Sequence, residues 1–270
     1  MSDRQAVYTH GHQEPVLRSH RSRTAANSAA YLLPELRPGQ AVLDVGCGPG
    51  TITADLAGLV GPTGRVVAVD TSAEVLAAAA EYTAGRGVGN VAFEVADAHR
   101  LPYADGEFDV VHAHQVLQHV TDPVAVLREL RRVTAPGGVV ACRDADYTAM
   151  TWYPELPELA GWMALYQRVS RANGGEPDAG RRLAAWARAA GFDRVACSSS
   201  TWTYATQEQR DWWGGLWADR VVDSGIARTA VADGYATPAE LAALSDGWRR
   251  WAADRDGWFA VLHGEILARV

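Results

Sequence analysis

The feature that most constrains this 270-residue chain is an apolar strand that runs directly into a glycine turn at residues 41–50. Residues 41–45 have the pattern of a β-strand, and residues 51–60 carry apolar side chains at helical spacing. Gly46 and Gly48 leave room for a ligand against the main chain, and the start of the next helix offers unpaired N–H groups. This arrangement predicts an open parallel sheet that binds a nucleotide-like ligand at the turn.

The spacing of the glycines separates two kinds of ligand. A dinucleotide-binding loop has the pattern G-x-G-x-x-G, whereas this turn reads G-x-G-x-G from Gly46 to Gly50. An acidic residue for a ribose is also present, because Asp70 ends the next apolar run, twenty residues after Gly50. The pattern therefore opposes a nicotinamide dinucleotide and still fits a ligand with a ribose.

Several motifs recur in an order that resembles the class I S-adenosylmethionine-dependent methyltransferases. The first is Asp44-x-Gly46-x-Gly48-x-Gly50. Later motifs resemble the ubiquinone-biosynthesis-like branch (methyltransferase type 11/25): Leu101-Pro102-Tyr103, Phe108-Asp109 and Pro136-Gly137-Gly138. The resemblance covers residues 41–145 and implies S-adenosyl-L-methionine as the cofactor.

The resemblance also implies which residues bind that cofactor. In the family, the acidic residue after the third strand accepts from the adenine amino group, which corresponds to Asp97 here. The residue after the fourth strand contacts the methionine portion, which corresponds to Gln115. The full set expected around the cofactor is Asp44, Gly46, Cys47, Gly48, Gly50, Asp70, Thr71, Asp97, Ala98, His114 and Gln115.

The acceptor side is implied by the same resemblance. The histidine of a Leu-x-His stretch faces the acceptor in the family, which makes His119 a candidate general base, while a histidine that caps a helix or bonds Asp122 is the alternative. The N-terminal segment often folds over the cofactor in the family, so Tyr8 is a candidate lid, and a solvated chain end is the alternative. The residues expected around the acceptor are His10, His119, Tyr147, Trp152 and Trp213.

No metal is expected. His112 and His114 share one face of a strand, but no carboxylate or cysteine stands at ligand spacing beside them, so packed histidines are the simpler interpretation. Asp144 and Asp146 end the next strand. The magnesium-dependent catechol-type methyltransferases place an acidic residue after the fourth strand and an Asp-Asn pair after the fifth, and this chain has neither.

Strands alternate with helices five times up to residue 145, which predicts an α/β fold with a doubly wound, mostly parallel, seven-stranded sheet. A helical pattern over residues 23–36 precedes the first strand, and two further helical stretches precede the last strand. We therefore expect an N-terminal arm and helix (residues 1–40), a Rossmann-like core (41–205 and 256–270) and a helical cap (206–255). The tryptophans, which lie between Trp152 and Trp258, indicate an apolar surface in the second half, as core or as substrate pocket.

The net charge and the cysteine content limit the kinds of partner and compartment that this chain is expected to have. The net charge of −7 opposes a nucleic-acid partner or an anionic membrane, because both need a basic face. The three cysteines form no C-x-x-C pair, and no apolar run approaches a membrane span, so a cytoplasmic protein is expected, either a monomer or a homodimer.

These features predict methyl transfer to the O, C or N atom of a small apolar or aromatic molecule, in secondary metabolism or quinone-like biosynthesis. Two alternatives stay open: a non-catalytic or cyclase-like protein that binds the same cofactor, and a nicotinamide oxidoreductase.

Overall fold

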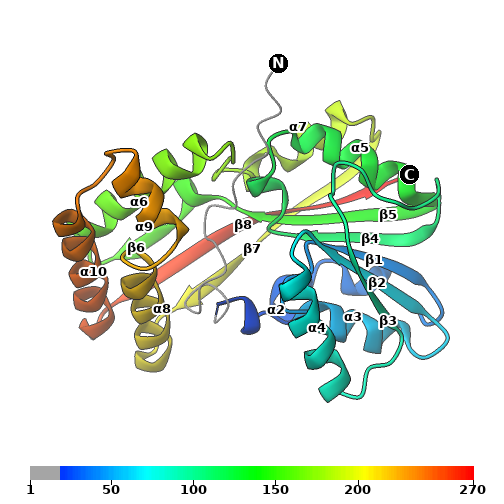
Figure 1. Cartoon of the computed structure of the whole chain (residues 1–270), viewed down its shortest axis with the longest axis horizontal. Coiled ribbons are helices and arrows are strands. Elements are labelled where there is room, and N and C mark those ends of the chain that lie inside the picture. The colour runs from blue at the N-terminus through cyan, green and yellow to red at the C-terminus, as the bar shows by residue number, and fades with distance from the viewer. Residues whose placement is uncertain (1–18) are drawn as a thin grey trace.

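The computed structural model describes residues 19–270, which form a sheet-containing half followed by a half richer in helices (Figure 1). The elements of the first half, in chain order, are α2 (Ala25–Ser28), η1 (Leu33–Glu35), β1 (Ala41–Val45), α3 (Thr51–Val60), β2 (Arg65–Asp70), α4 (Ala73–Gly85), β3 (Val91–Val95), β4 (Phe108–His114), η2 (Leu117–His119), α5 (Pro123–Val133) and β5 (Thr134–Ala145).

The second half adds two short 3-10 helices, five α-helices and three strands. Its elements are η3 (Tyr147–Ala149), β6 (Thr151–Tyr153), α6 (Pro157–Ala172), η4 (Gly180–Arg182), α7 (Leu183–Ala189), β7 (Arg194–Tyr204), α8 (Gln207–Arg220), α9 (Gly225–Ala232), α10 (Pro238–Ala253) and β8 (Trp258–Arg269).

The strands form one sheet in the order β3-β2-β1-β4-β5-β8-β6, and β7 pairs with β8 along its other edge. Strands β1 to β5 pair in parallel, whereas β8 is antiparallel to β5, β6 and β7. The winding reverses at β1, because the chain moves from β1 outward to β2 and β3 and then returns to β4 on the opposite side. Such a reversal opens a crevice at the carboxyl ends of the strands.

Helices cover both faces of this sheet, as the alternation along each strand requires. On β1, Val42 packs with Leu56 of α3 in one core cluster, and the next residue, Leu43, packs with Leu127 of α5 in the other. All four side chains are fully buried. The predicted α/β class with a doubly wound, mostly parallel sheet is confirmed, and the short strand β6 is an addition to it.

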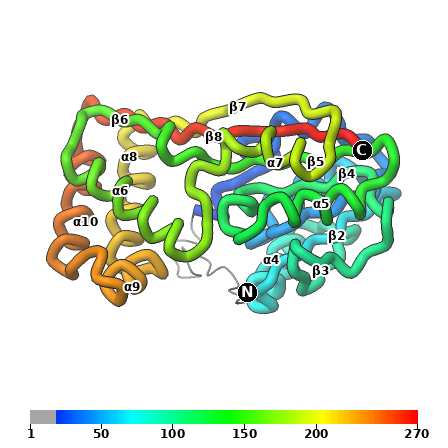
Figure 2. Tube along the Cα trace, turned by 90° about the horizontal axis from the view of Figure 1, so that it is seen from above, coloured from blue at the N-terminus to red at the C-terminus, as the bar shows by residue number. Residues whose placement is uncertain are grey.

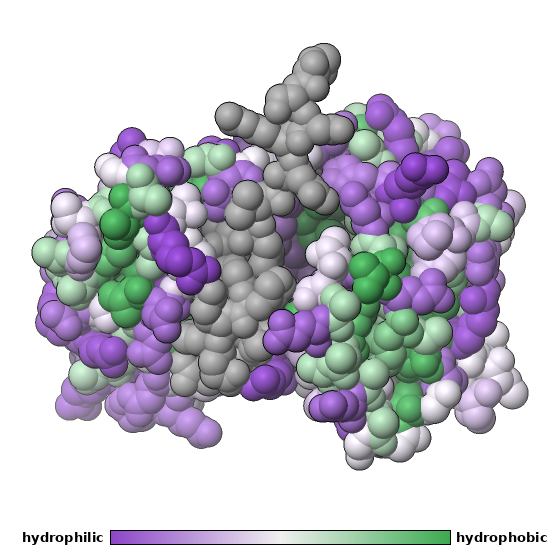
Figure 3. Space-filling model, viewed as in Figure 1, coloured by the Kyte–Doolittle hydropathy of each residue, from purple (hydrophilic) through white to green (hydrophobic). Residues whose placement is uncertain are grey.

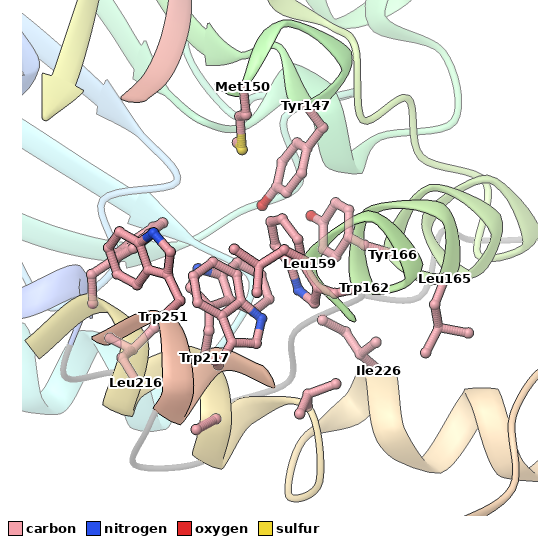
Figure 4. Packing of buried hydrophobic residues seen from close by; sticks show 14 of the residues in the cluster. Tyr147, Met150, Leu159, Trp162, Leu165, Tyr166, Leu216, Trp217, Ile226 and Trp251 are labelled. Atoms are coloured by element: carbon pink, nitrogen blue, oxygen red, sulfur yellow. The ribbon is translucent and has the colours of Figure 1, made fainter. Parts of the chain in front are cut away.

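A helical lobe of α6, α8, α9 and α10 lies beyond the end of β5, and strand β8 runs from this lobe into the sheet (Figures 1 and 2). Its core is aromatic. The ring of Trp162 on α6 meets Trp217 of α8 edge to face at 4.6 Å and Trp248 of α10 at 4.9 Å. Tyr147 points into the same cluster and stacks on Tyr166 at 3.9 Å (Figure 4). Five of the ten tryptophans are buried in this cluster, and three more pack against it while partly exposed.

Three segments differ from the sequence-based expectation. The helix predicted over residues 23–36 is divided into α2 and η1, since Pro34 lies within η1 and cannot donate a helical hydrogen bond. The expected cap of residues 206–255 contains the additional helix α9. The helical lobe also extends beyond that stretch, because α6 packs against α10 and α9.

The surface is mixed. On the face shown in Figure 3, hydrophilic residues predominate at the margins of both lobes, and smaller hydrophobic patches lie within each lobe. No helix within residues 19–270 is long and apolar enough to cross a membrane.

Candidate active site

The glycine turn after β1 is held against β2 by main-chain hydrogen bonds. The N–H groups of Gly46 and Cys47 both donate to the carbonyl oxygen of Val69, at 2.8 and 3.0 Å. Gly46 has a φ of +67°, and a Cβ atom there would lie 2.5 Å from Cγ2 of Val116. Gly48 has a φ of +53°. Glycine is therefore required at Gly46 both by the backbone conformation and by the space available.

A buried polar network underlies this turn. Oδ2 of Asp44 accepts a hydrogen bond from the Thr53 hydroxyl at 2.6 Å, and Oδ1 lies 2.8 Å from Nδ1 of His112. The three side chains are 3% exposed or less. Because two donors engage it, the carboxylate of Asp44 is fixed at the end of β1.

Two carboxylates stand at the ends of the neighbouring strands. Oδ2 of Asp70, the last residue of β2, accepts from the N–H of Gly48 at 3.1 Å, and Oδ1 accepts from Ser72 N–H at 3.2 Å. Asp97 follows β3, and its Oδ1 accepts from the N–H of His99 and lies 2.8 Å from the His99 ring. Burial acts to raise the pKa of Asp97, but these hydrogen bonds together outweigh burial and lower the pKa.

These strand ends and the glycine turn surround a cavity of about 490 Å³, here called the loop cavity. Ten of the eleven residues predicted to bind the cofactor line it: Asp44, Gly46, Cys47, Gly48, Asp70, Thr71, Asp97, Ala98, His114 and Gln115. Gly50 does not line this cavity. It is the N-cap residue of helix α3, and a Cβ atom on it would lie 2.9 Å from Cβ of Ala79, so this glycine serves the packing of α3 against α4.

A second cavity of about 400 Å³, here called the aromatic cavity, lies between the sheet and α8. Its aromatic lining consists of Tyr147, Trp202, Tyr204, Trp212, Trp213 and Trp217. Tyr147 and Trp213 were predicted there. Trp152 was also predicted there, but the structure stacks it on Phe259 at 5.7 Å, where it borders a separate hollow beside β6. Tyr8 and His10 lie outside the described residues.

The two cavities meet at four shared residues: His20, Arg23, Gln115 and His119. Gln115 has a φ of +55°, which is rare for a residue other than glycine, and its main-chain N–H donates to the carbonyl of Arg143 at 2.7 Å. Its side-chain Oε1 accepts from Arg23 at 2.7 Å, and its Nε2 lies 3.0 Å from Nε2 of His263. The amide is therefore held at the junction from both sides.

The environment of His119 disfavours the predicted role as a general base. Burial lowers its pKa to about 3, with a further contribution from the charge of Arg23. An effective general base has a pKa near the working pH, so a neutral imidazole of this kind accepts a proton weakly. Its Nε2 lies 2.9 Å from Nε2 of Gln118, which suits a hydrogen-bonding role.

His114 and His263 are also buried and neutral. Burial lowers the pKa of each well below its ordinary value. Nδ1 of His263 lies 3.1 Å from the carbonyl of Val261, which leaves its Nε2 to accept from Gln115. Neither ring nitrogen of His114 has a hydrogen-bond partner among residues 19–270, although the ring lines the loop cavity. A buried polar group without a partner is costly and is expected to meet a ligand.

His20, Arg23 and Arg220 line the aromatic cavity and were not predicted from the sequence, whereas Trp202 and Tyr204 belong to the aromatic-rich second half that was expected to form a core or a pocket. A signal existed for Arg220, because Trp213, Trp217 and Arg220 are spaced to share one face of α8. No local signal marks Arg23, which reaches the site through tertiary packing.

Other chemistry is disfavoured by the residues at the site. Burial raises the pKa of the Cys47 thiol, so it is not a thiolate at neutral pH. Within residues 19–270, no group of three or more His, Cys, Asp or Glu side chains is placed to hold a metal ion.

An adenosyl sulfonium cofactor fits the loop cavity. The glycine turn leaves its main chain open to a ligand, and Asp70 and Asp97 present acceptors at adjacent strand ends. His114 lines the same cavity with two ring nitrogens that have no hydrogen-bond partner within residues 19–270. A doubly wound sheet with this turn at its switch point and these strand-end carboxylates defines an S-adenosylmethionine-binding protein of the Rossmann-like methyltransferase class.

Comparison with known proteins agrees with this class. The chain belongs to the methyltransferase domain family, whose model matches residues 36–209, and S-adenosyl-L-methionine is its cofactor. An uncharacterized methyltransferase of Schizosaccharomyces pombe is 36% identical over 97% of this chain and 96% of its own length. The protein named probable methyltransferase ltbC from Aspergillus luteorubrus is 30% identical, with coverage of 97% and 96%. The predicted class I methyltransferase family is confirmed.

Solved structures share the fold at lower identity. Phosphoethanolamine N-methyltransferase 2 of Haemonchus contortus, solved with phosphomonomethylethanolamine and S-adenosylhomocysteine, is 19% identical with a TM-score of 0.56, over 89% of this chain and 52% of that one. The cyclase SpnF is 22% identical with a TM-score of 0.52, over 98% and 87%. At such identity the likeness concerns the fold alone.

Proposed function

We propose that this methyltransferase transfers a methyl group to a small planar acceptor, apolar or aromatic in its body, that binds in the aromatic cavity. One observation carries the proposal: the loop cavity and the aromatic cavity share Arg23, Gln115 and His119. A cofactor in the first and an acceptor in the second would therefore adjoin each other at this junction.

The chemistry asks little of the protein beyond positioning. S-adenosylmethionine supplies an activated methyl group on a sulfonium, and methyl transfer is a one-step displacement that depends on alignment and on exclusion of water. Gln115, clamped between Arg23 and His263, would position the groups at the junction. The neutral His119 would donate or accept a hydrogen bond there, which suits an acceptor that is already nucleophilic at neutral pH.

The cofactor site is tested with S-adenosylhomocysteine as the probe. We expect Asp70→Ala to weaken its binding by at least ~10-fold in calorimetry, because the variant loses the carboxylate at the end of β2 and the contact to Gly48. Asp256→Ala is the matched control, since that side chain is 71% exposed on a distant turn. Unchanged affinity in Asp70→Ala would place the cofactor elsewhere.

The acceptor site is tested by turnover with methyl-labelled S-adenosylmethionine and a panel of phenols, hydroquinones and aromatic acids. Tyr204→Ala should abolish product formation while S-adenosylhomocysteine still binds, because Tyr204 lines only the aromatic cavity. Tyr153→Ala is the control, with its side chain exposed on β6. Equal turnover in both variants would contradict the assignment of the acceptor.

A non-catalytic or cyclase-like role is the second candidate, and the likeness of the fold to the cyclase SpnF supports it. Tight cofactor binding with no methylated product over the whole panel would favour it. The nicotinamide oxidoreductase is opposed by the glycine spacing and by the family to which the chain belongs.

The broader setting is part of the same proposal. The net charge of −7 supports a small-molecule acceptor over a nucleic acid or an anionic membrane, and the unpaired cysteines support a reducing, cytoplasmic compartment. A role in secondary metabolism or quinone-like biosynthesis, as a monomer or homodimer, remains our expectation.

A further inference from the structure

Within residues 19–270, the charged side chains that line the aromatic cavity have the opposite sign to the net charge of the whole chain. Among residues 19–270, the charged lining of this cavity consists of Arg23 and Arg220, and no Asp or Glu side chain lines it. The chain as a whole carries a net charge of −7. A positively charged cavity in an acidic protein favours an anionic ligand, because apolar walls concentrate the field of the arginines within it.

The position of Arg220 directs its charge into this cavity. The residue ends α8, is 4% exposed, and its guanidinium lies 4.8 Å from the centre of the Trp217 ring. One Nη atom donates to the Ser19 hydroxyl at 2.8 Å. Burial raises the pKa of Tyr147 and of Tyr204, and in both cases the charge of Arg220 acts in the opposite direction. The guanidinium is therefore close to the tyrosines that line the cavity.

The walls beside Arg220 are flat. Tyr204 and Trp213 stack with ring centres 4.4 Å apart and an angle of 8° between their planes. Trp212 continues this surface at 6.0 Å from Trp213. Such a surface favours a planar ring that can stack on it or meet it edge to face.

We propose that the acceptor is an aromatic molecule with an anionic oxygen group, a carboxylate or an ionised phenol or enol, and that Arg220 binds this group. The inference rests on the proposed function and specifies the acceptor. Arginine suits the role because its planar guanidinium binds oxyanions in two-point geometry and stacks on aromatic rings. Arg23 lines both cavities, so its charge is shared with the cofactor site, whereas Arg220 lines only the aromatic cavity.

The test compares two probes of equal shape, 2-naphthoate and 2-naphthamide, on the full chain saturated with S-adenosylhomocysteine. Quenching of tryptophan fluorescence reports their binding. We expect the acid to bind at least ~10-fold more tightly than the amide, and Arg220→Gln to remove that preference. Arg220→Lys should keep part of it. Arg249→Gln is the control, because Arg249 pairs with Asp219 on the surface of the lobe with 57% of its side chain exposed, and it should behave as the wild type.

Each outcome bears on the proposal. Equal affinity for the acid and the amide in the wild type would overturn it, as would failure of both probes to bind at millimolar concentration. A preference for the acid that persists in Arg220→Gln would reassign the anion to another residue. Failure of S-adenosylhomocysteine to bind, with the acid still preferred, would instead count against the proposed function.

Discussion

At the scale of single residues, Gly46 determines the conformation of the turn that borders the loop cavity. Its positive φ is strained for any side chain, and Val116 occupies the place that a Cβ atom would need. The same residue closes the turn onto β2 through its N–H. A change here displaces the main chain that borders the loop cavity.

Gly46→Ala should therefore weaken S-adenosylhomocysteine binding by at least ~10-fold, which is about 1.4 kcal/mol, in calorimetry. Gly58→Ala is the matched control. Gly58 lies within α3 with open space around it, so alanine should leave the affinity unchanged and stabilise the helix by roughly 0.5–1 kcal/mol. Wild-type affinity in Gly46→Ala would separate this turn from cofactor binding.

At the scale of elements, the helical lobe depends on the close approach of α8 to α10. A Cβ atom on Gly214 would lie 2.7 Å from Cβ of Ala252 and 3.0 Å from the carbonyl oxygen of Trp248. Its neighbour Gly215 faces open space, with no atom within 4 Å. Two adjacent glycines of α8 therefore differ in their surroundings: Gly214 is packed against α10, and Gly215 faces open space.

This pair gives a sharp test of the packing. Gly214→Ala should lower the free energy of unfolding by about 1–3 kcal/mol, because the two helices must move apart. Gly215→Ala should raise it by roughly 0.5–1 kcal/mol through helix propensity alone. Urea denaturation measures both, and equal effects of the two substitutions would refute the contact between α8 and α10.

At the scale of the whole molecule, buried titratable groups set the response to pH. Burial lowers the pKa of His114, His119 and His263, and it raises the pKa of Asp144 to about 7. At a pH below 6.5, the ordinary histidine pKa, these three histidines bind protons in the unfolded chain but not in the folded protein. Asp144 offsets part of this, since its folded form takes up a proton near pH 7 and its unfolded form only near 3.8.

The free energy of unfolding should therefore fall by about 2 kcal/mol between pH 7.5 and 5.5, as measured by urea denaturation at each pH. Asp144→Asn removes the offset and should steepen the fall to about 4 kcal/mol over the same interval. Asp256→Asn, at an exposed site, should keep the wild-type dependence. A stability that rises on acidification would show that these histidines are not buried and neutral.

The first half of the fold and most of the lining of the loop cavity could be predicted because both depend on local patterns. Apolar runs typical of strands, apolar residues at helical spacing and glycines at the ends of elements identify β1 to β5 and the helices between them. Residues such as Gly46 and Asp70 act from strand ends, and parallel strands bring those ends to one edge of the sheet. Their position in the chain therefore determines their position in space.

The sequence by itself thus determined the family, the doubly wound sheet and the set of strand-end residues that line the loop cavity. Tertiary structure alone decided the acceptor side: that Trp152 packs on Phe259, that Gly50 serves the packing of two helices, and that Arg23 and Arg220 meet at one cavity. The physical reason is that a large aromatic or long cationic side chain can pack in a core or line a pocket with a similar gain in the stability of the fold. Only the packing of elements distant along the chain selects between the two.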